Sequence, residues 1–378
     1  MVYLDHAATT PMRPEVVDVL TEVSKEIFGN PSSVHGYGRK AHERLENARG
    51  TIAKSIHVKA DEIIFNSGGT ESDNTAILST ALSHQDKGKH VITTQIEHPA
   101  VLNTMRYLET LGFEVTYLPV DEKGQLAVET VKAALRPDTI LVSIMFANNE
   151  TGNLLPIPEI GALLQEHPAV FHTDAVQAYG KVPLFPHEWG IDLLSVSGHK
   201  INGPKGIGFL YKNQSLSLPT FLHGGEQEEK RRAGTENLAA ICAMAKAIEC
   251  LPETIQTENQ KKYGQFSDLV QSCLKKAGIT FRVNGDPDHK LTHILNLQFP
   301  GLSNELLLVH LDLKGYAIST GSACTAGNVE PSHVLEAMYG KESSVMEESI
   351  RVSFGYGNTK EEVESFCDTL IETIERLK

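Results

Sequence analysis

Residues 192–208 read Asp192-Leu-Leu-Ser-Val-Ser-Gly-His-Lys-Ile-Asn-Gly-Pro-Lys-Gly-Ile-Gly208. The apolar run from Ile191 to Val196 predicts a buried β-strand, and a glycine-rich loop follows it. Lys200 therefore stands where a strand ends, among small residues. Such surroundings desolvate the amine. Desolvation lowers its pKa and favours the neutral form that can react with an aldehyde. A solvated lysine in a turn is the alternative, and the rest of the chain must decide between them.

A phosphate-binding loop of a nucleotide hydrolase does not fit the same stretch. Gly198 and Gly203 have the spacing of the two glycines in such a loop, but Pro204 stands where its lysine is required. No serine or threonine follows to hold magnesium. The sequence therefore argues against nucleotide hydrolysis at this position.

The composition predicts a globular protein with a large core. The chain has 378 residues, 40% of them hydrophobic, which is enough for one large domain and a smaller one. No apolar run approaches the roughly 18 residues of a membrane helix, and the first residues lack the features of a signal peptide, so we expect a cytosolic protein. The formal net charge of −14, without a dense basic cluster, argues against direct binding of nucleic acid.

The five cysteines predict neither a disulfide framework nor a zinc site, because their number is odd and no Cys-x-x-Cys pair occurs. Four of them fall in helical patterns, where we expect small buried hydrophobic side chains: Cys242, Cys250, Cys273 and Cys367. Cys324 differs, since it lies in the non-periodic run Ser319-Thr-Gly-Ser-Ala-Cys-Thr-Ala-Gly327. We expect it to be a mobile, exposed thiol.

Strand and helix patterns alternate along most of the chain before residue 200. The expected strands are residues 62–65, 91–94, 114–118, 140–145, 170–173 and 191–196, with helices near 99–112, 127–135 and 157–166 between most of them. This alternation predicts an α/β fold with a mainly parallel sheet covered on both faces. Ligands of such sheets bind at the carboxyl ends of the strands.

Polar residues gather at these expected carboxyl ends. The segments are Glu97-His-Pro99, Ala147-Asn-Asn-Glu-Thr-Gly152, His172-Thr-Asp-Ala-Val-Gln177 and Ser197-Gly-His-Lys200. A further segment, Asn66-Ser-Gly-Gly-Thr70, leads from a strand into a helix that Thr70 would open. The free N–H groups of such a helix start bind phosphate well, although most turns of this kind only cap their helix.

This set of residues matches the needs of a pyridoxal phosphate site. That cofactor requires a lysine for its aldehyde, a carboxylate that keeps its ring nitrogen protonated, a phosphate cup and a group against the ring face. Lys200, Asp174, Gly69-Thr70 and His98 could fill these four places. A buried Asp174 would stay ionised only beside a cation such as a pyridinium, but a helix N-cap is an equally open interpretation of this residue alone.

The C-terminal third predicts a smaller α+β domain. We expect strands near 280–283, 293–298 and 349–353 and helices near 303–313, 331–338 and 360–377. The charged segment from Glu226 to Thr235 predicts a solvated loop before a helix that Thr235 could cap. Pro252 interrupts the helical stretch that follows, so we expect a large domain at 15–256 and a small one at 257–378 that residues 1–14 complete.

The chain resembles cysteine desulfurases of the nitrogen-fixation and iron–sulfur-assembly type, within the class V aminotransferase family of fold type I pyridoxal phosphate enzymes. The resemblance covers nearly the whole chain, because the motifs occur in the family's order and spacing. They are Leu4-Asp-His-Ala-Ala-Thr-Thr-Pro11, Ser67-Gly-Gly-Thr-Glu-Ser-Asp-Asn74, the rim segments quoted above, Gly321-Ser-Ala-Cys-Thr325 and Ser349-Ile-Arg-Val-Ser-Phe-Gly355. The resemblance implies a homodimer whose large domain contains seven mostly parallel strands.

It also implies the roles of the matched residues. Lys200 would hold the cofactor and move protons, Asp174 would pair with the ring nitrogen, and His98 would stack on the ring and assist proton transfer. The other implied cofactor contacts are Gln177 at the phenolic oxygen, Gly69, Thr70, Ser197 and His199 at the phosphate, and Thr235 at the phosphate of the neighbouring subunit.

The implied reaction takes sulfur from L-cysteine, releases L-alanine and leaves a persulfide on Cys324. Asn149 and Arg351 would hold the substrate carboxylate, Arg351 by a two-pronged contact. An iron–sulfur scaffold protein or a tRNA-thiolating enzyme would accept the sulfur. A selenocysteine lyase or an aminotransferase on the same fold is an alternative, and so is a sulfur-relay docking protein whose site has lapsed. The joint presence of the catalytic residue types argues against the last.

Overall fold

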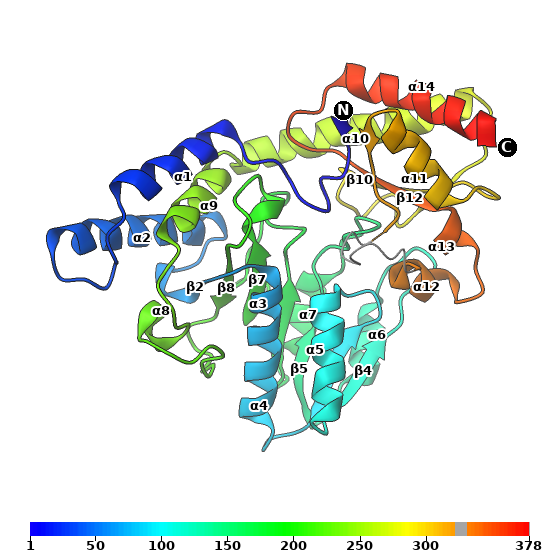
Figure 1. Cartoon of the computed structure of the whole chain (residues 1–378). Coiled ribbons are helices and arrows are strands. Elements are labelled where there is room, and N and C mark those ends of the chain that lie inside the picture. Colours follow the sequence, from blue (N-terminus) through cyan, green and yellow to red (C-terminus); the bar gives the residue numbers. More distant parts are fainter. Residues whose placement is uncertain (322–330, 378) are drawn as a thin grey trace.

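The computed structural model describes residues 1–321 and 331–377. A central sheet with helices on both sides forms the larger part, and the C-terminal helices lie to one side of it (Figure 1). The N-terminus lies beside these C-terminal elements, far from the helices that follow it in sequence. The two ends of the chain therefore meet in one region.

The central sheet is mixed and seven-stranded, in the order β2-β8-β7-β6-β5-β3-β4. Its strands are β2 (Ile63–Asn66), β3 (His90–Thr94), β4 (Glu114–Leu118), β5 (Thr139–Ser143), β6 (Val170–Asp174), β7 (Leu193–Ser197) and β8 (Gly208–Lys212). All neighbours are parallel except β8, which runs antiparallel to both β2 and β7. The predicted α/β fold with its mainly parallel sheet is confirmed, whereas β8 is absent from the predicted strands.

Alternate residues of the strands feed two separate cores, one on each face of the sheet. One face packs against a π-helical turn (Thr75–Ser79), which continues α3 (Gly69–Asn74), and against α4 (Thr80–His84) and α5 (Pro99–Thr110). The other face packs against α1 (Pro14–Glu26), α2 (Gly36–Ser55), α6 (Val128–Ala134), α7 (Ile157–Leu164) and α9 (Leu238–Glu249). Burial on both faces explains why every residue of the central strands β3, β5, β6 and β7 is buried, without the alternation of a half-exposed strand.

Predicted strand ends differ from the observed ends by one or two residues. The prediction for β5 ran on to Met145, because Ile144 and Met145 are as buried as the strand itself. The prediction for β7 began at Ile191, which is also fully buried although the strand begins at Leu193. Burial therefore extends beyond the last hydrogen-bonded residue of each strand. A hydrophobic pattern cannot locate that residue.

A third core lies among the C-terminal elements. It joins a three-stranded antiparallel sheet of β9 (Arg282–Asn284), β10 (Ile294–Gln298) and β12 (Ser349–Ser353) to α10 (Glu253–Lys276), α11 (Asn304–Leu313) and α14 (Lys360–Leu377). Leu4 belongs to this core. The remaining elements are β1 (Val2–Tyr3), which pairs with β11 (Tyr316–Ala317), and α8 (Gln227–Lys230), α12 (His333–Tyr339) and α13 (Val345–Glu348). The division into domains at residue 256 stays a prediction.

Predictions for three side chains need correction. Cys242 and Cys367 are buried as expected, but Cys250 and Cys273 are partly exposed, Cys250 because it caps the C-terminus of α9. Glu228 is buried, although its charged segment was expected to be solvated throughout. Across the described residues, no helix is long and apolar enough to cross a membrane.

Candidate active site

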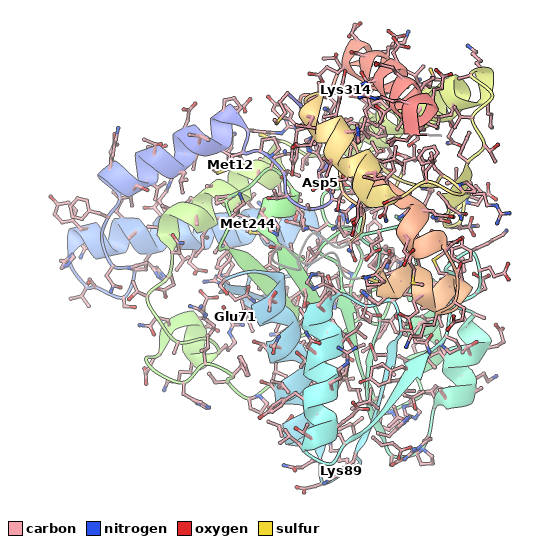
Figure 2. The ribbon with its side chains drawn as sticks, turned by 45° about the vertical axis from the view of Figure 1, so that its right-hand side comes forward. Asp5, Met12, Glu71, Lys89, Met244 and Lys314 are labelled. Atoms are coloured by element: carbon pink, nitrogen blue, oxygen red, sulfur yellow. The ribbon has the colours of Figure 1, made fainter. Side chains whose placement is uncertain are left out.

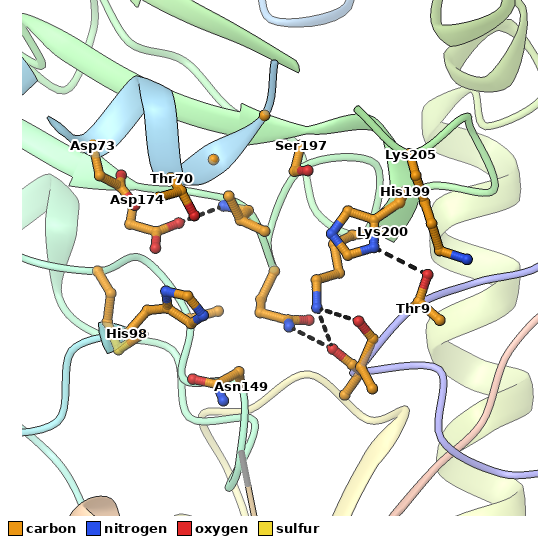
Figure 3. A pocket seen from close by; sticks show the side chains of 18 of the residues that line it. Thr9, Thr70, Asp73, His98, Asn149, Asp174, Ser197, His199, Lys200 and Lys205 are labelled. Carbon is orange, nitrogen blue, oxygen red and sulfur yellow. Dashed lines mark hydrogen bonds between the residues drawn. The ribbon is translucent and has the colours of Figure 1, made fainter. Parts of the chain in front are cut away.

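A cavity of about 480 Å³ opens at the carboxyl edge of the central sheet (Figure 3). Its walls come from the N-terminal segment, from the start of α3, from the residues after β6 and β7, and from β12. It is lined by the predicted residues Gly69, Thr70, His98, Asn149, Asp174, Gln177, Ser197, His199, Lys200 and Arg351. The structure therefore brings together the described site residues except Thr235.

Lys200 ends a short 3-10 turn after β7 and extends its amine toward the N-terminal segment. Its Nζ donates to the carbonyl oxygens of Ala7 at 2.6 Å and Ala8 at 2.7 Å. The backbone of Lys200 is fixed as well, since Lys181 Nζ donates to its carbonyl oxygen at 2.7 Å. Sequence reasoning missed this N-terminal wall, because backbone carbonyls carry no residue signature.

Asp174 ends β6 with its carboxylate buried beneath the cavity. Burial raises its pKa to about 6, against the opposite pull of the Val176 N–H, which donates to Oδ1 at 2.9 Å, and of the Lys200 charge. The alternative interpretation of Asp174 as a helix N-cap is wrong, because turns and not a helix follow it. A buried carboxylate with so little internal compensation favours a cationic ligand.

Two further buried groups, Asp73 and His172, lie near Asp174. Burial and the nearby Asp174 charge raise the pKa of Asp73 well above its usual range. His172 is held between Ser143 Oγ at 2.8 Å and Ser195 Oγ at 2.9 Å, and burial lowers its pKa to about 3, so the ring is neutral. Asp73 lies one helical turn after Gly69, a spacing that placed it below the helix start and could have identified it from the sequence.

The turn between β2 and α3 forms a close-fitting cup at one end of the cavity. Gly68 has φ of 140°, which only glycine adopts without strain, and a Cβ on Gly69 would lie 2.7 Å from Val176 Cγ2. The helix begins at Gly69 with Gly68 as N-cap, so Thr70 does not open it as predicted. Thr70 is instead the second helical residue and lines the cavity with Ser197 (Figure 3).

His98 and His199 supply two neutral imidazoles. Burial and the Lys200 charge lower the pKa of each to about 4. His98 caps α5, and its Nδ1 accepts the Ala100 N–H at 3.1 Å, which puts the proton of the neutral ring on Nε2. His199 Nδ1 bonds to Thr9 Oγ1 at 3.0 Å, so the N-terminal segment orients this ring too.

Arg351 lies in β12 and is 1% exposed, yet it lines the cavity. Its Nη1 donates to the Asn149 carbonyl oxygen at 2.8 Å and its Nη2 to Asp5 Oδ1 at 2.8 Å, whereas Nε has no hydrogen-bond partner among the described residues. One prong of the guanidinium is thus already bonded to a carboxylate. Asp5, which was not predicted, lies between the helices near Met12 and Met244 and the C-terminal elements (Figure 2).

Among the described residues of the prediction, Thr235 is not part of this cavity. Thr235 is exposed on the loop before α9, and the helix is capped by Asn237, whose side chain accepts the Ala240 N–H at 3.3 Å. The predicted cap at Thr235 is therefore wrong by two residues. Cys324, the predicted nucleophile, lies in residues 322–330, outside the described part of the chain.

The groups in the cavity fit one kind of ligand. A lysine amine suits an aldehyde, a buried carboxylate suits a cationic ring nitrogen, and a glycine turn at a helix start suits a phosphate. In the part of the chain that the structure describes, no cluster of three or more histidine, cysteine or acidic residues could hold a metal ion. The donor set therefore fits pyridoxal phosphate.

Known proteins resemble this chain over its full length. The Aminotransferase class-V family matches residues 2–366. A protein of Bacillus subtilis (strain 168) named putative cysteine desulfurase IscS 1 is 53% identical over 376 residues, covering 100% of this chain and 99% of the relative. A solved NifS-like protein is 34% identical with a TM-score of 0.93 over 100% of both chains. A structure of SspA in complex with cysteine is 34% identical with a TM-score of 0.83, over 94% of this chain and 99% of the other.

Proposed function

Given that this chain belongs to the class-V aminotransferase family and, within it, to the cysteine desulfurases, we propose that the cavity described above binds pyridoxal phosphate and L-cysteine together. The observation that carries the proposal is the meeting of Lys200, Asp174 and the Gly68–Thr70 turn in one cavity. Bound there, pyridoxal phosphate supplies an electron sink for the electrons released at the substrate's Cα. The chain's own residues bind, orient and move protons around it.

Three sides of the cofactor would be held by different elements. Asp174 keeps the ring nitrogen protonated, because a pyridinium relieves the penalty of its buried charge. Gln177 donates to the phenolic oxygen through the amide N–H that is not bonded to the Ala7 carbonyl. The phosphate is bound by Gly69, Thr70, Ser197 and His199, and by Thr235 of the neighbouring subunit.

Proton transfer is assigned to Lys200 and His98. The Ala7 and Ala8 carbonyls accept the N–H groups of Lys200 Nζ and would hold a proton on Nζ near the substrate. His98 stacks on the ring face and is a neutral donor through Nε2, since Nδ1 is bonded to the start of α5. The N-terminal segment thus takes part in the reaction through its backbone.

The substrate carboxylate is bound by Asn149 and Arg351. Because Asp5 already occupies Nη2 of Arg351, an incoming carboxylate shares or displaces that bond to make a two-pronged contact. The structure of SspA with cysteine supports an amino acid of this size as the ligand. The Cys324 thiolate would attack the substrate Sγ, so that an S–S bond forms as the Cβ–Sγ bond breaks. The electron pair of the broken bond stays with the carbon skeleton, which takes up protons and leaves as L-alanine, while the persulfide remains on Cys324.

The partners of the protein belong to the same proposal. We assign it a homodimeric state, a cytosolic location and a sulfur acceptor that is an iron–sulfur scaffold protein or a tRNA-thiolating enzyme. The relatives are named cysteine desulfurases, which supports removal of sulfur from cysteine, and sulfur removed in this way requires an acceptor.

The test is made on the purified protein with three chains: wild type, Lys200→Ala and Cys324→Ala. The visible absorption spectrum is recorded first, and alanine and sulfide release from L-cysteine are then measured with a reductant. We expect a cofactor band in the wild type that Lys200→Ala lacks, and alanine formation that Cys324→Ala reduces by about 100-fold or more, the scale of losing a nucleophile.

Each opposite result points to a specific alternative. A colourless wild type that does not take up added pyridoxal phosphate means that the site has lapsed and the protein is a docking member of a sulfur relay. Alanine formation that is indifferent to Cys324→Ala means that the chemistry is that of an aminotransferase or a lyase that needs no nucleophilic thiol.

A further inference from the structure

Glu228 is a buried carboxylate that does not line the cavity and has no role in the reaction above. It lies in the segment from Lys212 to Arg232, in which every other residue is at least partly exposed. Its own segment is rich in charge, so burial of one glutamate among solvated neighbours calls for a specific partner. That partner is Arg49 of α2.

Arg49 and Glu228 form a two-pronged ion pair away from water. Nη1 donates to Oε2 at 2.7 Å and Nη2 to Oε1 at 2.8 Å, and the carboxylate raises the pKa of the guanidinium above its usual value despite burial. The pair also caps the free edge of the central sheet. Phe65 N–H of edge strand β2 donates to Glu228 Oε2 at 2.9 Å, and Arg49 Nη1 donates to the Ile63 carbonyl at 3.0 Å.

The backbone at this anchor is strained. Glu228, Glu229 and Lys230 have φ of 47°, 54° and 66°, so three consecutive residues with side chains adopt the left-handed conformation. Each costs on the order of 1 kcal/mol relative to a right-handed residue and persists only where surrounding contacts impose it. Strain of this kind is found where the chain must present a functional group.

The strained turn controls the position of Thr235. Gln227 Oε1 accepts the Gly234 N–H at 3.0 Å, which closes the segment on itself one residue before Thr235. Arg232 bonds in two-pronged fashion to Glu71, at 2.8 and 3.1 Å, and thereby ties the segment to the start of α3, where Figure 2 shows Glu71. Asn237 caps α9 on the other side. Thr235 therefore projects from a segment that is fixed before and after it.

We propose that Glu228 is a positioning residue: seated on the edge of β2 by Arg49, it shapes residues 227–234 into an arm that presents Thr235 to the cofactor phosphate of the neighbouring subunit. The inference rests on the proposed homodimer and on the role proposed for Thr235. The new element is that the buried pair of Glu228 and Arg49 sets the conformation of the arm. The arm is preformed, so its hydrogen bond to phosphate needs no ordering of a loop on binding.

The experiment compares two probes that differ only in the phosphate. Apoprotein dimers are titrated with pyridoxal phosphate and with pyridoxal, and the visible band gives the half-saturating concentration of each. We expect Glu228→Gln to weaken pyridoxal phosphate binding about 10-fold, the effect of losing one hydrogen bond to a charged group, and to leave pyridoxal binding unchanged. A merely structural role of Glu228 would weaken both probes alike.

Four further variants complete the design. Thr235→Val should reproduce the phosphate-specific loss, and the double variant Glu228→Gln/Thr235→Val should lose no more than either single variant. Glu226→Gln, which removes an exposed ion pair to Lys230 at 2.9 Å on the same turn, is the control that should change nothing. If Glu228→Gln does not fold, Gln227→Met removes the tie to Gly234 without touching the buried pair and should give the same phosphate-specific loss.

Sedimentation of the wild type distinguishes a failure of the proposed homodimer from a failure of the positioning role of Glu228. A monomeric wild type overturns the homodimer of the proposed function and the arm with it. A dimer in which Glu228→Gln, or Gln227→Met in its place, binds pyridoxal phosphate as tightly as the wild type overturns the positioning role alone. The same holds if pyridoxal phosphate and pyridoxal are weakened equally.

Discussion

The carboxyl rim of the sheet around Asp174 and its open edge around Glu228 each bury a carboxylate, and both side chains belong to residues only 6% exposed. Glu228 is neutralised within the chain by a two-pronged arginine and a backbone N–H. Among the described residues, Asp174 accepts a hydrogen bond only from the Val176 backbone N–H, and burial raises its pKa. A buried charge that the chain compensates itself serves the architecture, whereas one left to be compensated by a ligand marks the functional site.

Breaking the pair at the sheet edge should have the largest effect on stability. Arg49→Met leaves Glu228 buried without its cation and should lower the free energy of unfolding by about 3–5 kcal/mol. Urea denaturation of the cofactor-free protein measures it. The double variant Arg49→Met/Glu228→Met removes both charges and should recover most of the loss. A loss below about 1 kcal/mol for the single variant would mean that water reaches Glu228. Glu228 would then not be a buried charge that depends on Arg49.

At the rim, by contrast, removing the carboxylate should raise the free energy of unfolding. Because the folded protein raises the pKa of Asp174 from 3.8 to about 6, the folded state binds this proton more tightly than the unfolded state, and stability falls as pH rises through that window. Asp174→Asn should therefore stabilise the cofactor-free protein at pH 8 by on the order of 1–3 kcal/mol. The gain should vanish near pH 4, and thermal unfolding at both values of pH measures it.

Adding pyridoxal phosphate provides the control for the rim. With the cofactor added, the wild type should gain thermal stability and become more stable than Asp174→Asn, since only the carboxylate pairs with the ring nitrogen. If Asp174→Asn is less stable than the wild type at pH 8 without cofactor, an internal group already compensates Asp174, and the contrast between the two regions disappears.

The smallest effect concerns the strained turn. Lys230 has φ of 66° and is exposed, so Lys230→Gly should relieve strain and raise the free energy of unfolding by about 0.5–1 kcal/mol. Lys132→Gly, at an exposed position inside α6, is the matched control and should lower it by about 1 kcal/mol. Equal losses for both would show that the turn at Lys230 is not strained.

Patterns with a local cause were predictable from the sequence. The alternation of apolar runs gave the parallel strands, and polar residues after those runs gave Asp174, His98 and Lys200 at one rim. The antiparallel β8 was missed because a glycine-rich loop precedes it and no helix follows it directly. Hydrophobic periodicity reports burial, and it cannot report the direction of a strand.

Contacts between distant segments were not predictable. Asp5 meets Arg351 across 346 residues, and the Ala7 carbonyl meets Lys200 across 193 residues. Glu228 looked like one of many solvated charges, because the arginine that buries it is 179 residues away. Such pairings depend on how the elements are packed, which a single sequence does not state.

The bonds between Leu4 and the C-terminal strands also fix an order of events during synthesis. Leu4 N donates to the Ala317 carbonyl at 2.9 Å, Ser353 N donates to the Leu4 carbonyl at 2.7 Å, and the Ala7 N–H donates to Ser353 Oγ at 2.9 Å. The ribosome makes Leu4 hundreds of residues before Ser353, and β12 must emerge before the N-terminal segment can dock. A nascent chain therefore lacks the docked N-terminal wall that holds Lys200 until β12 has been translated.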